Sequence, residues 1–336
     1  MRKLILKEGY RPALSLRDTE RAIKLVKDDF ERRLGEALGL DRVSAPLIVA
    51  ASSSINDDLS GVERKVTFDL KEIPGETMEI VQSLAKWKRK ALREYGFGDG
   101  EGLYTDMNAV RRDDDMDNLH AVLVDQWDWE KVLTADQRTE AFLKATVQII
   151  ADVIADTKEA VRALYPALTE EVRREVYFIT SQELEDRYPG LSGKEREHAI
   201  VKEQRTVFIM QIGDKLRSGA PHDGRAPDYD DWALNGDLLL WSDVLERPVE
   251  LSSMGIRVNA ESLKAQLKKA GCEERLQFPY HKGIVEGTLP LTIGGGIGQS
   301  RICLLLLEKL HIGEVLASVW SAADHAACAA AGIPLL

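Results

Sequence analysis

The chain has few cysteines and no long hydrophobic run. Its 336 residues include three cysteines, Cys272, Cys303 and Cys328, and no two of them form the CxxC pair that is typical of zinc sites. This number and spacing exclude a disulfide framework and a structural zinc site, so we expect the thiols to pack in apolar surroundings in a cytoplasmic protein. No stretch approaches the roughly 18 apolar residues of a membrane span, and we therefore expect no membrane partner.

The chain also has fewer basic than acidic residues. Lysine and arginine total 45 against 56 aspartate and glutamate residues, which gives a net charge of -11. Broad binding to a phosphate backbone needs the opposite balance, so the composition disfavours a nucleic-acid partner. The sequence also lacks internal repeats, low-complexity blocks and proline-rich or serine-rich linkers. Although the length would allow roughly two domains, this continuity favours one domain over residues 1–336.

Helical and strand patterns are mixed along the whole chain. Apolar residues at helical spacing follow Ser15, a suitable N-cap, and end at Gly39, a suitable C-cap. Pro46 interrupts the strand that comes next and restricts it to a sheet edge. Because the strands do not alternate regularly with helices, the pattern favours the α+β class with an antiparallel sheet. The further predicted helices cover 84–96, 138–163 and 260–270, and the strands cover 62–70, 77–83, 120–130, 175–181, 206–213, 237–241 and 249–258, before a strand, turn and helix at 291–310.

The segment HAVLVDQWDWE, residues 120–130, carries polar and aromatic side chains in alternation. In a strand, Gln126, Asp128 and Glu130 share one face. Trp127 and Trp129 then point to the other face, together with Asp125. One interpretation is a half-exposed strand whose tryptophans lie in the core. The other is a strand whose polar face lines a binding site.

The segment GGGIGQSR, residues 294–301, joins a strand to a helix. Gln299 occupies the place of the third glycine in a GxGxxG pattern, and the segment lacks the GK[ST] of a P-loop, so neither nucleotide-binding motif is supported. Its glycines allow close approach of a ligand to the backbone, and the new helix begins with amides that favour anions. Arg301 opposes the helix dipole there, which suggests an external phosphate, carboxylate or aromatic partner. The alternative is tight helix–sheet packing with a solvated arginine.

Two charged segments are ambiguous when each is taken alone. MNAVRRDDDMD, residues 107–117, and RAPDYDDW, residues 225–232, both have the composition of solvated surface loops. Asp237 and Glu250 stand at opposite ends of a predicted hairpin, where they would face each other and share a divalent cation. Carboxylate oxygens of this kind suit Mg²⁺ that is held jointly with substrate phosphates.

In order along the chain, these segments resemble the catalytic core of class II aminoacyl-tRNA synthetases. A helix leading into a proline-containing strand, Arg111 at a strand end and GGGIGQSR correspond to the three motifs of that class. QSLAKWK, DQWDWE and VELSSMGIR are closest to the aspartyl and asparaginyl enzymes, although Leu84 stands where they have proline. With RAPDYDDW and LNGD added, and with residues 1–14 too short for an anticodon-binding domain, nearly the whole chain resembles the ammonia-dependent asparagine synthetases.

This resemblance implies a homodimer whose antiparallel sheet is flanked by helices, with neither an anticodon-binding nor a glutaminase domain. It implies that ATP activates the side-chain carboxylate of L-aspartate as an adenylate, with Mg²⁺, and that ammonia then displaces AMP. The implied catalytic residues are Asp57, Arg111 and Gln126. The implied aspartate-binding residues are Ser83, Lys88, Gln126, Asp128, Arg225, Asp230, Ser253 and Arg257. The implied ATP-binding residues are Arg111, Asp237, Glu250, Leu251, Ser252, Gly298 and Arg301, of which Asp237 and Glu250 also hold the metal ion.

Several details of this assignment depart from the family pattern or depend on local geometry. Asp58 adjoins Asp57, so the residue that handles ammonia has a one-residue ambiguity. Ala121 replaces a small polar residue expected near the nucleotide, and the loop between RAPDYDDW and LNGD is shorter. Glu250 and Arg257 are seven residues apart and would point to opposite faces of an ideal strand. Both line one pocket only if the strand ends or bulges near Gly255.

Other functions are compatible with the same segments. A glutamine-dependent synthetase needs an N-terminal cysteine nucleophile, whereas Met1 is followed here by Arg2, so ammonia is the expected nitrogen donor. One rival is a synthetase paralogue that transfers an activated amino acid to tRNA or to a protein lysine. The other is a non-catalytic regulatory subunit that binds metabolites. The joint presence of the arginines and acids argues against a decayed site.

Overall fold

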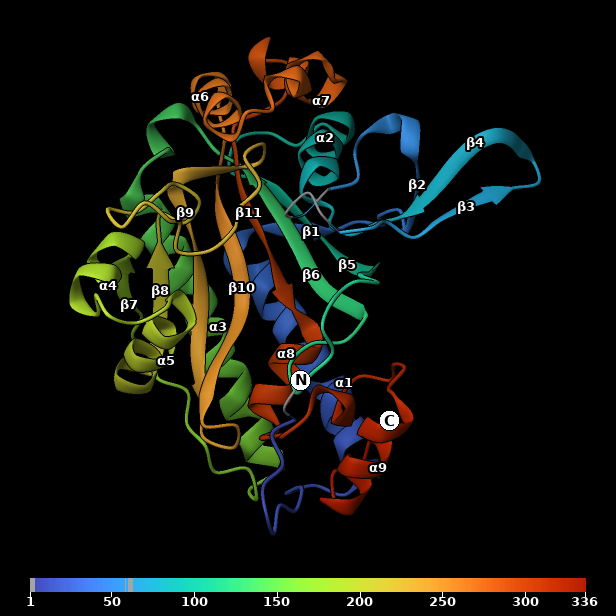
Figure 1. The fold of residues 1–336 in the computed structure, drawn as a ribbon, viewed down its shortest axis with the longest axis vertical. Helices are drawn as coiled ribbons and strands as arrows, with labels where there is room; N and C mark the ends of the chain where they lie inside the picture. The colour runs from blue at the N-terminus through green and yellow to red at the C-terminus, as the bar shows by residue number, and fades with distance from the viewer. Residues whose placement is uncertain (1–3, 58, 60–62) are drawn as a thin grey trace.

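The computed structural model describes residues 4–57, 59 and 63–336 and is built around an eight-stranded sheet (Figure 1). The strand order is β1-β5-β6-β11-β10-β9-β8-β7, and adjacent strands among the six central ones are antiparallel to one another. The strands are β1 (Leu40–Arg42), β5 (Gly102–Val110), β6 (Leu123–Val132), β7 (Tyr177–Thr180), β8 (Thr206–Met210), β9 (Asp230–Ser242), β10 (Arg247–Arg257) and β11 (Thr292–Gly298). The α+β prediction is therefore confirmed.

The antiparallel pairing does not extend to the two edges of the sheet. β1 pairs in parallel with β5, and β7 pairs in parallel with β8. Parallel neighbours need a long crossover connection. The chain provides one in each case, because α2 (Ala85–Tyr95) lies between β1 and β5, and α4 (Ser181–Arg187) and α5 (Gly193–Gln204) lie between β7 and β8.

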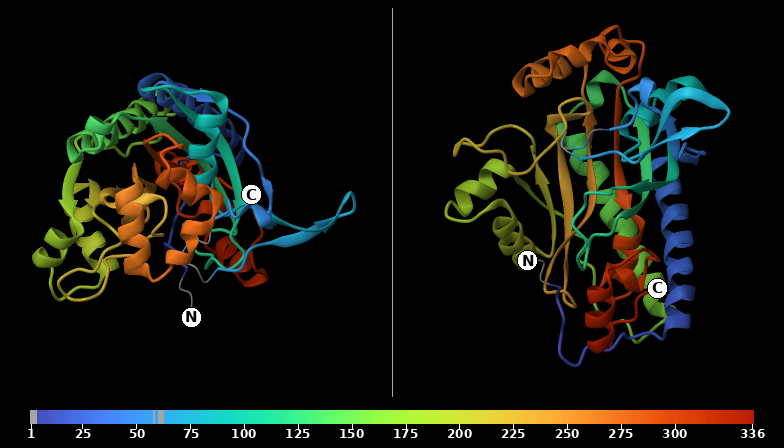
Figure 2. Two further views of the ribbon diagram at one scale, coloured as in Figure 1. Left: turned by 90° about the horizontal axis from the view of Figure 1, so that it is seen from above. Right: turned by 45° about the vertical axis from the view of Figure 1, so that its right-hand side comes forward.

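Two long helices, α1 (Leu16–Leu38) and α3 (Glu140–Leu164), lie against each other on one face of the large sheet (Figure 2). α1 has the predicted caps, because the Ser15 side chain accepts a hydrogen bond from the Asp18 amide and Gly39 has the left-handed φ of 67°. The remaining helices are α6 (Ala260–Ala270), α7 (Pro279–Val285), α8 (Gln299–Leu306) and α9 (Ala322–Ala330). None of the helices in the described residues combines the length and hydrophobicity that a transmembrane span requires.

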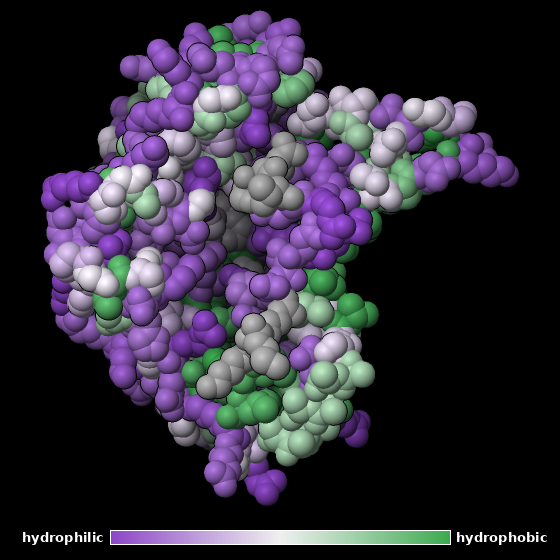
Figure 3. All heavy atoms as spheres, in the orientation of Figure 1, coloured by the Kyte–Doolittle hydropathy of each residue, from purple (hydrophilic) through white to green (hydrophobic). Residues whose placement is uncertain are grey.

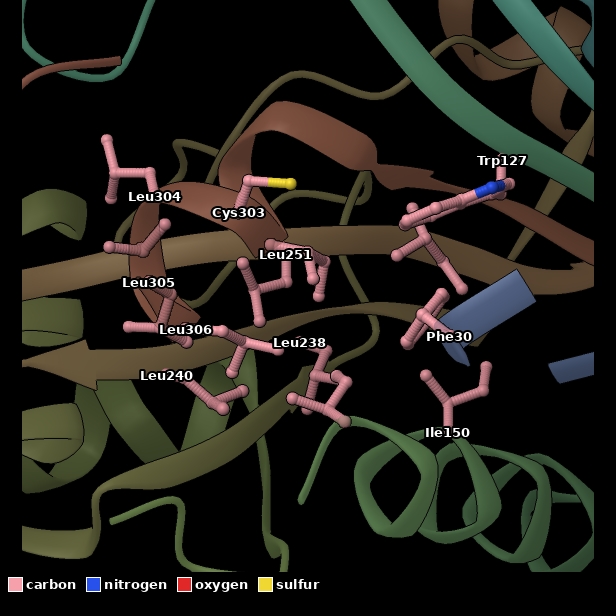
Figure 4. Packing of buried hydrophobic residues seen from close by; sticks show 14 of the residues in the cluster. Phe30, Trp127, Ile150, Leu238, Leu240, Leu251, Cys303, Leu304, Leu305 and Leu306 are labelled. Atoms are coloured by element: carbon pink, nitrogen blue, oxygen red, sulfur yellow. The ribbon is translucent and has the colours of Figure 1, made fainter. Parts of the chain in front are cut away.

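The main core fills the space between the large sheet and helices α1, α3 and α8 (Figure 4). Trp127 and Trp129 are fully buried there, and the ring of Trp127 lies 4.6 Å from that of Phe30 on α1. The prediction that the tryptophans face the core is thus confirmed. Cys303 and Cys328 are buried as expected, whereas Cys272 is only half-buried. One cluster joins buried residues from Leu14 to Ile333, and the single domain over residues 1–336 stays a prediction.

A second sheet of three strands projects from the body beside β1 (Figure 1). Its strands are β2 (Ile48–Ala50), β3 (Thr67–Leu70) and β4 (Ile73–Ile80), and β2 forms one edge. Pro46 lies between β1 and β2, so the predicted strand is interrupted at proline and continues only at an edge. Of the strand predicted at 62–70, the structure has residues 67–70, and Val62 lies outside the described residues.

Candidate active site

The face of the large sheet opposite α1 contains a cleft of about 650 Å³, within the usual size of small-molecule sites (Figure 3). Much of the surface visible around it is hydrophilic. All of the residues that the resemblance implies line this cleft except Asp237. They are Asp57, Ser83, Lys88, Arg111, Gln126, Asp128, Arg225, Asp230, Glu250, Leu251, Ser252, Ser253, Arg257, Gly298 and Arg301. Asp237 lies directly behind Arg225, with which it forms an ion pair.

The polar face of β6 forms the floor of the cleft, as its alternation predicts. Gln126 and Asp128 line the cavity, and Glu130 on the same face is fully buried. The Lys88 ammonium lies 3.4 Å from the Asp128 carboxylate and donates a 2.9 Å hydrogen bond to the Gly295 carbonyl. Burial lowers the pKa of Lys88, and the Asp128 charge only partly opposes this shift. The floor thus contains a buried lysine with a carboxylate beside it.

Arg257 of β10 has two buried carboxylate partners. Its Nη2 lies 2.8 Å from Glu130 Oε2, and its Nη1 binds the Asp230 carboxylate. Burial would raise the pKa of Glu130, but the charge and hydrogen bonds of Arg257, the charge of Lys88 and the Thr292 hydrogen bond together lower it. Thr292 donates a further 2.7 Å hydrogen bond to Glu130. Arg257 therefore has its guanidinium fixed in orientation before any ligand binds.

The β10 strand bulges, but not at the predicted place near Gly255. The pairing register of β10 with β9 shifts between Gly255 and Arg257, and again between Glu250 and Ser252. Only the shift at Glu250 and Ser252 adds a residue to β10, because the extra residues at the other shift belong to β9. One such bulge changes the face to which the following side chains point. The result is that Glu250 and Arg257 line the same cleft, as predicted.

The glycines of GGGIGQSR have a second role besides the expected one. A Cβ atom at Gly294 would overlap the Glu130 carboxylate, and one at Gly296 would overlap Gln126. These glycines therefore make room for side chains of β6, and Gly296 also lines the cleft. The α8 amide at Ser300 donates a 3.0 Å hydrogen bond to Asp125, so a protein carboxylate already occupies this helix start. Gly298 and Arg301 remain at the cleft surface.

Two arginines reach the cleft from positions predicted by the sequence. Arg111 follows β5 directly, and its Nε and Nη2 both donate to the Gln82 carbonyl at 3.3 Å. Arg301 is the third residue of α8, and its Nη1 donates a 3.0 Å hydrogen bond to the Glu250 carbonyl. Its ion pair with the Glu250 carboxylate is longer, at 3.7 Å. Carbonyl oxygens thus orient both guanidinium groups at the cleft without cancelling their charge.

The proposed metal ligands do not face each other directly. Asp237 is opposite Ser253 and Glu250 is opposite Leu239, so the two carboxylates are diagonal neighbours on adjacent strands. Arg225 Nη2 donates a 2.6 Å hydrogen bond to Asp237. Burial raises the pKa of Asp237; Arg225 opposes this rise and the nearby Glu250 charge adds to it. Within residues 4–57, 59 and 63–336, no three His, Cys, Asp or Glu side chains are grouped to hold a metal alone.

Asp57 lies in the connection that follows β2 and has 1% exposure. The side-chain amide of Gln82 contacts its carbonyl oxygen at 3.4 Å. Asp57 lines the cleft, whereas Asp58 lies outside the described residues, so the choice between them stays a prediction.

Several lining residues were missed by sequence reasoning. Asp114, Asp115 and Asp117 line the cleft, so their segment, which composition alone leaves ambiguous, forms part of its wall. Tyr229, beside Asp230, also lines it, and its place inside RAPDYDDW was the available signal. Lys194 comes from α5 and lies 3.1 Å from Asp223, another lining residue. The sequence around Lys194 has no motif, and only the packing of α5 against β10 brings it to the cleft.

Comparison with known proteins gives a consistent family and fold. A family model described as aspartate-ammonia ligase matches residues 17–332. The aspartate–ammonia ligase of Lactobacillus johnsonii is 56% identical over 334 residues, with 99% of each chain covered. That of Ruminiclostridium cellulolyticum is 57% identical over 336 residues, with 100% of each chain covered.

Among solved structures, the asparaginyl-tRNA synthetase of Pyrococcus horikoshii complexed with asparaginyl-adenylate matches with a TM-score of 0.65. It is 14% identical, and the match covers 89% of this chain and 68% of that one. The likeness at this identity concerns the fold, and it confirms a class II synthetase-like catalytic fold.

Proposed function

The chain belongs to the aspartate–ammonia ligase family, and on this premise we propose how its cleft makes asparagine. The family's reaction is the ATP-dependent synthesis of L-asparagine from L-aspartate and ammonia. We propose that it runs through a β-aspartyl-AMP intermediate and releases AMP and pyrophosphate. One observation carries the proposal: a single cleft of about 650 Å³ holds both the paired charges suited to an amino acid and the arginines suited to phosphates.

In this proposal the floor of the cleft binds aspartate. Asp128 and Asp230 accept hydrogen bonds from its ammonium group, and Arg257 binds its α-carboxylate, since a planar guanidinium recognises a carboxylate by two parallel hydrogen bonds. Glu130 supports this role because it fixes the orientation of Arg257 from behind. The remaining contacts to aspartate come from Ser83, Lys88, Gln126, Arg225 and Ser253.

The first step joins aspartate to the nucleotide. A side-chain carboxylate oxygen of aspartate attacks the α-phosphorus of ATP, and the bond from that phosphorus to the pyrophosphate oxygen breaks. Arg111 bridges the attacking carboxylate and the α-phosphate, where negative charge accumulates in the transition state. Arg301 binds the adenine face or the phosphates, and Leu251, Ser252 and Gly298 complete the nucleotide site. Positioning and charge stabilisation account for the acceleration.

Mg²⁺ fits the pair of carboxylates at Asp237 and Glu250. The raised pKa of Asp237 indicates that buried negative charge is in excess there, with burial as the main cause and Glu250 adding to it. Two carboxylates also suit Mg²⁺, which usually takes its other ligands from substrate phosphates and water. When bound, the ion neutralises phosphate charge. Arg225, which binds Asp237, places a second positive charge beside this position.

The second step forms the amide. Ammonia attacks the carbonyl carbon of the adenylate, and the bond from that carbon to the phosphate oxygen of AMP breaks. Ammonium must lose one proton before the attack and the adduct must lose another after it. We propose that Asp57 holds ammonium and accepts a proton, with Gln126 beside the reacting carbonyl. Cleft residues thus provide for both half-reactions.

A homodimer and a cytoplasmic location complete the proposal, with neither nucleic acid nor membrane as partner. The fold family supports the homodimer. The small sheet and the segment before it expose Leu47, Ile48 and Ile73, each more than 40% accessible, which is a surface suited to a second copy of this chain. Light scattering on the purified protein would test the dimer.

The decisive experiment incubates the purified protein with aspartate, ATP, Mg²⁺ and ammonium. We expect asparagine and AMP in equal amounts. ADP in place of AMP would refute the adenylate. Transfer of an activated amino acid to tRNA or to a lysine, without free asparagine, would favour the paralogue hypothesis, and absence of both products would favour a regulatory subunit.

A further inference from the structure

A buried charged cluster lies behind the cleft, and the reaction described above does not use it. At its centre, Asp228 is fully buried and its Oδ2 has three partners. Lys86 Nζ lies 3.0 Å away, Arg275 Nη1 lies 2.9 Å away and His281 Nε2 lies 3.0 Å away. Burying several charges together is costly unless each is paired. A charged cluster in this place therefore calls for a functional reason.

The cluster ties together two walls of the cleft. Lys86 is the second residue of α2, two positions before Lys88. Asp228 is two positions before Asp230 and adjoins Tyr229. Since Lys86 and Asp228 are both less than 5% exposed, their contact fixes the start of α2 against the loop that precedes β9.

The turn that precedes Lys86 also contacts the segment that carries Asp57. The Asn56 side chain accepts a 2.8 Å hydrogen bond from the Gln82 amide, and Gln82 in turn contacts the Asp57 carbonyl. These contacts bring Asp57 against the turn that leads into α2. Burial alone would lower the pKa of Lys86, but attraction by Asp228 and then by Asp57 outweighs it and raises the pKa. The raised pKa favours a charged Lys86 in its ion pair with Asp228.

From this arrangement we infer that Lys86 is a positioning residue for the amide-forming step. Anchored on Asp228, Lys86 fixes the start of α2, and the contacts of Gln82, just before that helix, hold the Asp57 segment at the cleft wall where ammonia is to be received. Electrostatic attraction is strong in such a buried setting, and a small displacement of a catalytic group has a large effect on rate. The inference rests on the proposed function of Asp57 in ammonia handling.

The test compares two half-reactions in Lys86 variants. Lys86→Gln keeps a hydrogen-bond donor for Asp228 but removes the charge, whereas Lys86→Arg keeps the charge. We expect Lys86→Gln to leave aspartate-dependent ATP–pyrophosphate exchange within about threefold of the wild type while kcat/KM for ammonium falls at least about tenfold. Lys86→Arg should recover most of that loss. Lys90→Gln is the matched control, because Lys90 is exposed on the same helix and pairs with Glu94, and it should change neither rate.

Two results would overturn the inference. An equal loss in both half-reactions of Lys86→Gln would indicate a purely structural role, and unchanged kinetics would indicate none. Lys86→Met provides the same comparison should Lys86→Gln not fold. Asp57→Asn separates this inference from the proposed function. Full asparagine synthesis by Asp57→Asn refutes the function proposed for Asp57, whereas failed amide formation there, with normal Lys86→Gln, refutes only the role of Lys86.

Discussion

Arg257 on β10 binds Glu130 on β6 across the whole width of β11, which lies between these two strands. The residue of β11 that pairs with Glu130 is Gly294, and it also pairs with Gly255 on β10. The ion pair crosses β11 where no side chain obstructs it. Gly294 therefore contributes to the proposed aspartate site by leaving space for this ion pair.

Gly294→Ala should damage this site. Its Cβ atom would overlap the Glu130 carboxylate, so Glu130 must move and Arg257 loses the partner that orients it. We expect the KM for aspartate to rise at least about tenfold, and unfolding to become easier by about 2 kcal/mol, as for other overpacked sites. Steady-state kinetics and thermal melting measure the two effects. Gly190→Ala, where a Cβ would meet no atom within 4 Å, is the control, and equal effects in both variants would contradict this explanation.

Arg111→Ala should abolish adenylation. If Arg111 stabilises charge at the α-phosphate, its loss lowers the rate of aspartate-dependent ATP–pyrophosphate exchange by about 100- to 1,000-fold. Thermal melting should stay close to that of the wild type, because Arg111 is only partly buried and bonds a carbonyl. The neighbouring Arg112 is exposed, so Arg112→Ala is the matched control. Normal exchange in Arg111→Ala would remove this residue from its proposed role.

Glu250→Gln should weaken the binding of magnesium, so that activity requires more of it. Losing one of two carboxylates lowers the charge available to the ion, so the Mg²⁺ concentration for half-maximal adenylation should rise by about tenfold. Chelation of divalent cations should stop the wild-type reaction. Glu246→Gln, in the turn between β9 and β10, is the control because Glu246 is exposed and pairs with Lys7. An unchanged magnesium requirement in Glu250→Gln would argue for other ligands.

Glu170 should make stability depend on pH. Burial, and then repulsion by Glu308, raises its pKa from 4.5 to about 7 in the folded protein. The folded state thus keeps a proton that the unfolded chain loses, so this group's contribution to stability is complete below pH 4.5 and is lost as the pH rises to 7. Glu170→Gln removes this dependence. We expect the variant to match the wild type near pH 4 and to be more stable by about 1 kcal/mol above pH 7, allowing for solvent screening.

Thermal melts at several pH values would measure the effect of Glu170→Gln. Glu171→Gln alters the adjacent glutamate, whose side chain is largely exposed, and should show no such trend. A stability difference between Glu170→Gln and the wild type that does not change with pH would contradict the raised pKa.

Local features of the fold were accessible from the sequence because they depend on neighbours along the chain. The helix predicted at 260–270 has those bounds in the structure, with Asn259 as its N-cap and Gly271 as its C-cap. The opposite faces of Gln126 and Trp127 follow from strand geometry alone. Most of the predicted site residues could be named because each lies in a recognisable motif, and the structure has them in one cleft.

Long-range partners were not accessible from the sequence in the same way. The sequence shows neither that Arg225 binds Asp237 nor that the α8 amide at Ser300 binds Asp125, because such pairs form only when separate strands and helices pack. Lys194 likewise reaches the cleft through packing of α5. The parallel edges of the sheet depend on where the crossover connections return, which no local pattern records.

By itself, the sequence determined the class of fold, the capped helices, the two-sided strand β6 and the motif residues. These are set by residue propensities, spacing and caps that act within a few positions of the chain. Only the tertiary structure decided which charges neutralise one another and which glycines make room for side chains. It also paired Lys86 with Asp228 and brought Gln82, just before α2, against Asp57, because burial and charge pairing depend on surfaces brought together from distant parts of the chain.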